Sequence, residues 1–161
     1  MRSSMSRRLA VIAMIPAVLL GPAVMPSPAS AAPGTQSLQS DILRLTNYQR
    51  GKHGCAPVRQ DKRLVSAGRA HSAWMSRTGT FSHTGSGGST FVTRVRAAGY
   101  QAARSENIAK GYRTGADVVN AWMRSSGHRA NILDCTAMAV GVGAAHAADG
   151  TPYYTQDFGS R

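Results

Sequence analysis

The C-terminal part of the chain contains two segments with the two-residue period of strands, joined by Asp149-Gly150, and in the first of them large apolar side chains alternate with alanine or glycine. Asp-Gly between two such segments is a strong signal for a tight β-hairpin turn. The pattern therefore predicts antiparallel strands over residues 137–145 and 153–158. The candidates for inward-facing side chains on the first of these strands are Met138, Val140 and Val142. Strands that follow a run of helical segments favour an α+β fold over an alternating α/β one.

Four segments before the hairpin have the spacing of amphipathic helices. They cover about residues 37–50, 61–79, 90–98 and 114–125. Ser37 and Asp61 stand where the first and second helices would be capped, and Gly79 stands where the second would end. Two shorter pieces complete the pattern: residues 105–110 are expected to form a loop or brief strand, and residues 128–133 one further turn of helix.

The first 31 residues have the organisation of a secretory signal peptide. Three arginines, at positions 2, 7 and 8, precede an apolar stretch from Leu9 to Leu20, and Ala29-Ser30-Ala31 is a small-x-small cleavage site. The apolar stretch is short for a transmembrane helix. We expect an exported, extracellular protein with no membrane span after cleavage, a short flexible lead over residues 32–37, and one domain over residues 38–159.

Two cysteines, Cys55 and Cys135, remain after the signal peptide. An even number of cysteines in an exported chain predicts a disulfide, and two cysteines allow one intramolecular pairing. Neither cysteine belongs to a CxxC motif, which argues against a redox or metal role. The alternative of two free thiols is disfavoured by export to an oxidising compartment.

The formal net charge of the full chain is +12, and removing the three N-terminal arginines leaves a net charge of +9. A basic protein can bind anionic partners such as wall polymers, acidic lipids or nucleic acid. The arginines are scattered along the chain, however, and no interleaved aromatic pattern suggests stacking on bases. We therefore expect no nucleic-acid partner and interpret the charge mainly as a source of solubility.

Four short blocks contain the residues best suited to chemistry or binding. They are Phe81-Ser82-His83, Ser105-Glu106-Asn107-Ile108-Ala109, the stretch from Trp122 to Leu133 with Gly127-His128-Arg129, and Tyr154-Thr155-Gln156-Asp157-Phe158-Gly159. Glu106 is the only glutamate of the chain. In order and spacing, these blocks resemble the CAP superfamily, which comprises the cysteine-rich secretory, antigen 5 and pathogenesis-related 1 proteins. The chain is most similar to its bacterial, SCP-like extracellular members.

The resemblance implies a three-layer α-β-α sandwich with a small, mostly antiparallel sheet, and a monomer. It also implies that His83, Glu106 and His128 line one open cleft. Ser125 occupies the position where many members carry a second glutamate, and Ser105 the position where a glycine is usual. The remaining polar residues are interpreted structurally: Asn107, Asn131, Gln156 and Asp157 as braces of loops and the last strand, and His71 as a core or boundary histidine.

Two imidazoles and one carboxylate can hold a divalent cation such as Zn²⁺, or bind a polar ligand by hydrogen bonds. A hydrolase would use Glu106 as a base and a metal-bound water as the nucleophile, yet the chain has no HExxH or GxSxG motif. Three hypotheses follow. The cleft could bind a small apolar, lipid, sterol-like or wall-derived ligand, with or without metal; it could be a metal-dependent, peptidase-like hydrolase; or its polar cluster could be purely structural in an interaction protein.

Overall fold

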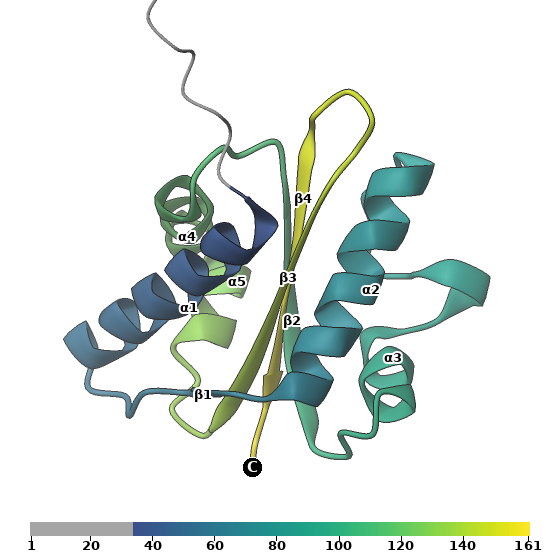
Figure 1. Ribbon diagram of the computed structural model, residues 1–161. Helices are drawn as coiled ribbons and strands as arrows, with labels where there is room; N and C mark the ends of the chain where they lie inside the picture. The colour runs from purple at the N-terminus through teal and green to yellow at the C-terminus, as the bar shows by residue number, and fades with distance from the viewer. Residues whose placement is uncertain (1–33) are drawn as a thin grey trace, which may run out of the picture. The chain divides into compact units, whose positions relative to one another are not determined.

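A computed structural model describes residues 34–161, which form a sheet between two groups of helices (Figure 1). The predicted signal peptide and the first residues of the predicted lead lie outside this range. The helices are α1 Thr35–Lys52, α2 Lys62–Thr78, α3 Phe91–Ala97, α4 Gly115–Arg124 and α5 Ser126–Ile132. The strands are β1 Arg59–Gln60, β2 Ala103–Lys110, β3 Ala139–His146 and β4 Pro152–Gly159. Within the described residues, no helix is both long and apolar enough to cross a membrane.

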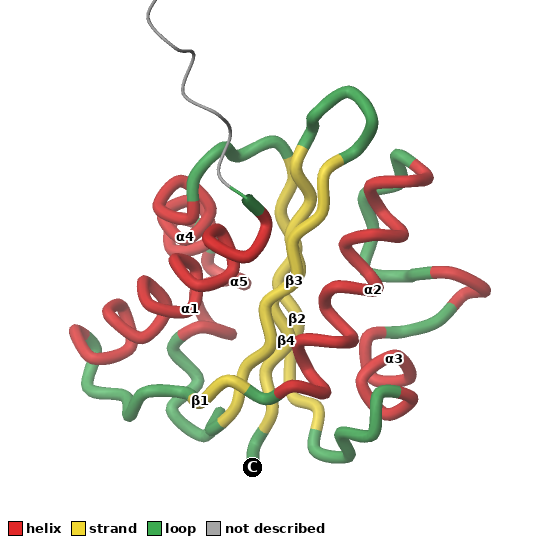
Figure 2. Tube along the Cα trace, viewed as in Figure 1, coloured by secondary structure: helices red, strands yellow, loops and turns green. Residues whose placement is uncertain are grey.

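The sheet has the order β1-β3-β4-β2. The short strand β1 pairs with β3 in parallel, whereas β3 with β4 and β4 with β2 are antiparallel. Helices α1, α4 and α5 cover one face of the sheet, and α2 and α3 cover the other (Figures 1 and 2). The α+β class, the three layers and the mostly antiparallel sheet expected from the sequence are confirmed.

Local signals determine where the helices begin and end. Asp61 caps α2 by accepting a hydrogen bond from the Arg63 N–H at 2.8 Å, and Gly79 ends this helix in the left-handed conformation. The expected cap of α1 is wrong, because Gly34 holds the N-cap position and Ser37 lies inside the first turn. The Ser37 hydroxyl donates to the Gly34 carbonyl at 2.8 Å, so the last three residues of the expected flexible lead are helical.

Two expectations for the strands need correction. Residues 103–110 form a full strand of eight residues rather than a loop or brief strand, because they pair with β4 along almost their entire length. Met138 is 49% exposed and does not point into the core, since β3 begins one residue after it. Val140 and Val142 are buried as expected.

Helix α2 lies very close to β3. Gly68 on the helix and Gly141 and Gly143 on the strand make this approach possible. A Cβ atom on Gly141 would lie 2.0 Å from the carbonyl carbon of Leu64, and one on Gly143 would lie 2.1 Å from that of Gly68. These distances are far below van der Waals contact, so only glycine fits on the strand at either position. The close contact fixes α2, and the loop that follows it, against the sheet.

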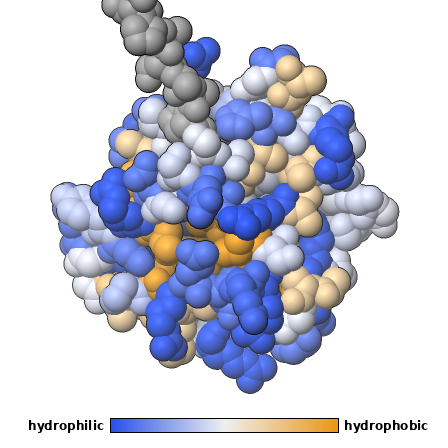
Figure 3. Space-filling model, in the orientation of Figure 1, coloured by the Kyte–Doolittle hydropathy of each residue, from blue (hydrophilic) through white to orange (hydrophobic). Residues whose placement is uncertain are grey.

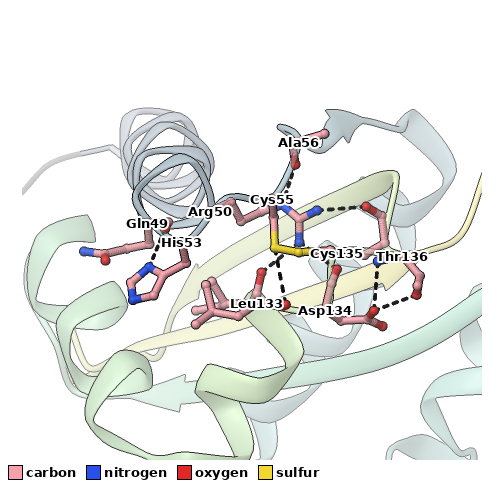
Figure 4. Close-up of a disulfide and its surroundings, with 11 residues drawn as sticks. Gln49, Arg50, His53, Cys55, Ala56, Leu133, Asp134, Cys135 and Thr136 are labelled. Atoms are coloured by element: carbon pink, nitrogen blue, oxygen red, sulfur yellow. Dashed lines mark hydrogen bonds between the residues drawn. A yellow bond between two sulfur atoms is a disulfide. The ribbon is translucent and has the colours of Figure 1, made fainter.

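The disulfide Cys55–Cys135 predicted from the sequence is present, with the two Cα atoms 4.9 Å apart. Beside it lies Arg50, which is fully buried (Figure 4). Its guanidinium donates four hydrogen bonds of 2.8–3.0 Å to the carbonyls of Ala56, Ile132, Asp134 and Ala137. Burial lowers the pKa of Arg50, and the charge of Asp134 opposes that shift. The disulfide and this arginine together join the end of α1 to the segment between α5 and β3.

Candidate functional site

Glu106 lies on the edge strand β2, and its side chain is only 1% exposed. Its Oε1 atom lies 2.8 Å from Nδ1 of His83, whose side chain is 57% exposed. Its Oε2 atom accepts a hydrogen bond of 2.5 Å from Arg94. Burial raises the pKa of Glu106, but the hydrogen bond from His83 and the positive charge of Arg94 outweigh it and hold this pKa below its usual range. Glu106 is therefore an ionised carboxylate with both oxygens occupied.

Arg94 is the residue of this cluster that the sequence reasoning missed. It lies on α3, and its guanidinium also donates to the carbonyls of His83 and Ser89, at 3.0 and 2.8 Å. Arg94 therefore fixes the loop that carries His83 as well as the Glu106 carboxylate. One signal could have found it: Arg94 shares a helical face with the apolar Phe91 and Val95, where an unpaired arginine would be costly to bury.

Asp157 lies directly opposite Glu106 on the neighbouring strand β4 and is 1% exposed. Its Oδ1 atom has no hydrogen-bond partner among the described residues. Burial, together with the negative charge of Glu106, raises the pKa of Asp157 well above its usual range. Two buried carboxyl groups side by side cannot easily both ionise. Asp157 is thus the member of the pair that keeps its proton to the higher pH, a role its interpretation as a simple strand brace did not foresee.

Replacing Asp157 with asparagine is expected to stabilise the protein at neutral and alkaline pH. Because the pKa of Asp157 is raised on folding, its contribution to stability is fully present below the unfolded-state pKa and is lost as the pH rises through the folded-state pKa. An uncharged asparagine removes this loss, with a gain on the order of 1 kcal/mol. Urea unfolding at a series of pH values measures the effect.

The control for this experiment is Asp41→Asn, which changes an exposed carboxylate on α1. Its effect on stability should be small across the same pH range, as for most surface substitutions. If Asp157→Asn destabilises the protein equally at every pH, Asp157 does not carry the proton assigned to it.

The other face of β2 carries a buried amide network. Asn107 donates to the Gln156 side-chain oxygen at 3.0 Å, and Asn131 donates to the Asn107 side-chain oxygen at 2.8 Å. Gln156 in turn donates to the Thr46 hydroxyl on α1 at 2.8 Å. These contacts match the bracing roles expected for Asn107, Asn131 and Gln156. The network positions α5, and with it His128, because Asn107 also donates to the His128 carbonyl at 3.3 Å.

The free edge of β2 is capped by side chains. The indole N–H of Trp122 donates to the Ile108 carbonyl at 3.0 Å, and the Asn131 amide donates to the Glu106 carbonyl at 3.3 Å. Uncapped edge strands can pair with strands of other molecules, so natural proteins often cover them. Here the caps come from the same helices that form one wall of the neighbouring groove.

Next to this edge is a groove with a volume of about 280 Å³. Its lining residues are Phe81, Ile108, Ala109, Lys110, Tyr112, Ala121, Trp122, Ser125 and His128. Most of these side chains are apolar or aromatic, while Ser125, His128 and Lys110 supply the polar atoms. Partial burial, with a smaller contribution from the charge of His83, lowers the pKa of His128. His128 is accordingly a neutral imidazole at neutral pH, able to donate or accept a hydrogen bond.

His71 contacts the loop that carries His83. It is 1% exposed, which confirms its interpretation as a core histidine. It stacks on Trp74 with ring centroids 5.6 Å apart, and its Nε2 atom lies 2.9 Å from the Ser82 carbonyl oxygen. Burial and, secondarily, the charge of Arg94 lower the pKa of His71, so the ring is neutral at neutral pH. Through this contact with Ser82, His71 supports the backbone next to His83.

The three residues proposed as metal ligands, His83, Glu106 and His128, do not form one cluster in the structure. His83 and Glu106 are in direct contact, whereas His128 belongs to the groove on α5. Both Glu106 oxygens are engaged, and within residues 34–161 no three His, Cys, Asp or Glu side chains cluster in a way that could hold an ion. The arrangement instead fits an ion-paired carboxylate that orders the wall of a groove.

The chain is similar to known proteins in both sequence and fold. The cysteine-rich secretory protein (CAP) family matches residues 43–158. The chain is 38% identical over 116 residues to the uncharacterised protein YkwD of Bacillus subtilis (strain 168), covering 71% of this chain and 45% of that one. It therefore spans less than half the length of this curated relative.

Two solved structures share the fold of this chain. An extracellular protein of Bacillus anthracis that contains an SCP domain is 29% identical, with a TM-score of 0.71 over 79% of this chain and 41% of that one. An outer surface protein of Borrelia burgdorferi shares the fold at 20% identity, with a TM-score of 0.70 over 80% of this chain and 98% of the other. The family match, which extends from α1 to β4 and includes every residue of the Glu106 cluster, shows that the chain belongs to the cysteine-rich secretory protein (CAP) family.

Proposed function

We propose that this CAP-domain protein is exported and binds a small amphipathic molecule in the groove beside β2. The observation that carries the proposal is the groove itself, with apolar walls from Phe81, Ile108 and Trp122 and polar atoms from Ser125 and His128. Its volume of about 280 Å³ is close to the lower end of the range for small-molecule sites, roughly 300–1,000 Å³. Apolar walls with a few placed polar groups are the usual composition of such sites.

The electrostatics of the groove favour a ligand with an acidic head. Lys110 places a positive charge at the groove, the neutral His128 can donate a hydrogen bond there, and the chain as a whole is strongly basic. The nearby carboxylate, Glu106, is ion-paired with Arg94, hydrogen-bonded to His83 and buried, so it repels an anion only weakly. We therefore infer a lipid-like acid, with its chain among the aromatic side chains and its head near Lys110 and His128.

Catalysis is less well supported by the same contacts. A general base must reach the proton that it removes, but Glu106 is 1% exposed and both of its oxygens accept hydrogen bonds already. In this proposal Glu106 orients His83 and the loop with Phe81, and the ligand does not touch it.

Export is supported by three observations. Residues 1–31 have signal-peptide organisation, the two cysteines form a disulfide, and a relative of known structure is described as extracellular. Disulfides persist in oxidising compartments outside the cytosol.

The test uses a fluorescent fatty acid, 11-(dansylamino)undecanoic acid, titrated into the purified protein. Saturable fluorescence enhancement is expected, and Ala121→Trp, which fills the groove, should weaken binding at least about tenfold, equivalent to about 1.4 kcal/mol. Ala130→Trp is the control, because Ala130 is exposed on α5 and does not line the groove. Equal binding by the Ala121→Trp variant, or no binding by the wild type, would leave the groove as a structural feature only.

A further inference from the structure

The edge of the sheet at β3 is only partly covered. Strand β1 has two residues and pairs with Ala139 and Val140. The backbone N–H groups of Arg59 and Asp61 donate to the carbonyls of Met138 and Val140, both at 3.0 Å. The chain then leaves the edge, because Asp61 caps α2. The next part of β3 therefore has no strand beside it in the described part of the chain.

Val142 presents its backbone N–H and C=O at this open edge. Along a strand these groups alternate between the two sides, so Val142 directs them to the same side as Met138 and Val140. On the opposite side, Gly141 and Gly143 pair with β4. Within residues 34–161, no backbone group outside the sheet ladders and no side chain bonds the Val142 N–H or C=O. One donor and one acceptor thus have no partner among the described residues, and because Val142 is only 4% exposed, a ligand can reach them only through the hollow beside this edge.

This edge opens into a hollow of about 140 Å³ between α1 and α2. Its lining includes Gln36, Gln39, Leu43, Gln60, Val65 and Arg69, together with Val142. Figure 3 shows apolar surface gathered in the space between α1 and α2 and framed by hydrophilic side chains. Carboxamide side chains carry both donors and acceptors, so the rim offers the same kinds of groups as a peptide backbone.

Arg69 supplies a fixed positive charge at the hollow. Its Nε atom donates to the side-chain oxygen of Gln39 at 2.8 Å, and Gln39 is itself 8% exposed. Arg69 is exposed, and it forms no ion pair with any carboxylate of residues 34–161. With Nε held by a buried partner, the two terminal nitrogens remain for a carboxylate, the group that the guanidinium fork matches best.

The two edges of the sheet contrast with each other. The β2 edge has its carbonyls at Glu106 and Ile108 capped by Asn131 and Trp122. The β3 edge at Val142 has no such cap in the described chain, although helices flank it on both sides. A free donor and acceptor in line, a flanking hollow and a carboxylate-binding group are the elements of strand addition with capture of a C-terminus.

We propose that the open edge of β3 at Val142 binds the end of an extended peptide, which continues the sheet beyond β1 and places its terminal carboxylate on Arg69. The peptide donates to the Val142 carbonyl and accepts from the Val142 N–H. An apolar side chain of the peptide contacts Leu43 and Val65, which line the hollow. This site is separate from the groove beside β2, and it is selective for a main chain, since a fatty acid has no amide to pair with Val142.

Titration of the ¹⁵N-labelled protein with N-acetyl-Ala-Val-Ala tests the proposal. The Val142 amide resonance is expected to shift downfield in a saturable way, and its exchange with solvent is expected to slow. Arg69→Gln should weaken binding about tenfold or more, because it removes a charge-assisted hydrogen bond. The C-terminal amide of the same peptide should show a similar loss. Ser40→Trp fills the hollow from α1 and should abolish binding, whereas Ser37→Trp, on the same helix but not in the lining, should not.

Three results would overturn the proposal. The first is the absence of saturable shifts at the β3 edge with millimolar peptide. The second is equal binding of a peptide that is N-methylated at its valine, since that peptide lacks the strand-pairing donor. The third is strong protection of the Val142 amide before any peptide is added, which would mean that another part of this chain already covers the edge. A ¹H–¹⁵N spectrum of Ser40→Trp with the same spread of resonances as the wild type confirms that the variant is folded.

Discussion

Replacing Gly143 with alanine is expected to destabilise this protein strongly. The added Cβ atom would lie 2.1 Å from the carbonyl carbon of Gly68 and 2.2 Å from its oxygen, both backbone atoms of α2. Backbone atoms cannot move aside by a rotamer change, so α2 must separate from the sheet. Overpacking usually costs about 1–3 kcal/mol; here we expect more than about 3 kcal/mol, out of a total of roughly 5–15 kcal/mol typical of small proteins. Urea unfolding followed by circular dichroism measures the loss.

Gly127→Ala is the matched control. Gly127 lies in α5, has no atom within 4 Å of an added Cβ, and does not have a positive φ. Alanine is favoured over glycine in a helix by roughly 0.8–1 kcal/mol, so this variant should be slightly more stable than the wild type. If Gly143→Ala unfolds at the same urea concentration as the wild type, the close approach of α2 to β3 is wrong.

Replacing Cys55 with serine is expected to cost roughly 4–5 kcal/mol in oxidising buffer, an upper figure from the chain-entropy account of loop closure. The disulfide closes a loop with a sequence separation of 80 residues. That loop contains α2, α3, β2, α4 and α5, and therefore both walls of the groove. Opening it allows the unfolded chain many more conformations and lowers the free energy of unfolding. Thermal unfolding with and without a reductant measures the change.

The reduced wild type is the internal control for this variant. Cys55→Ser and reduced wild type should unfold at nearly the same temperature, since neither has the cross-link. Equal unfolding temperatures under oxidising conditions would instead show that the disulfide does not form in solution.

Much of the fold follows from local signals. Asp61 and Gly79 stand at the two ends of α2, and Asp149-Gly150 lies in the connection between β3 and β4, as the sequence predicts. These features were predictable because capping and turn formation involve residues close in sequence. The predicted start of α1 was less accurate, because Gly34, which has no side chain, holds the N-cap position. The disulfide was predictable because the chain has two cysteines and the pattern of a signal peptide.

The site depends on contacts that no local pattern encodes. Glu106 and Asp157 meet because β2 and β4 pair in a particular register, and Arg94 reaches Glu106 from a helix 12 residues earlier in the chain. The resemblance to a family pointed to His83, Glu106 and His128, yet the structure joins His83 to Glu106 and leaves His128 in the groove. The structure adds two roles to this picture: Arg94 helps to keep Glu106 ionised, and Glu106 in turn raises the pKa of Asp157.

The sheet order β1-β3-β4-β2 also constrains how folding can proceed. Strand β4 lies between β3 and β2, although it is the last of the four in the chain. Until residues 152–159 have been synthesised, β2 has no neighbour in the sheet and Glu106 has no Asp157 beside it. Pairings between such distant segments form slowly. Folding of this domain should therefore follow synthesis rather than accompany it, and a nascent chain that ends before Pro152 is expected to remain sensitive to protease.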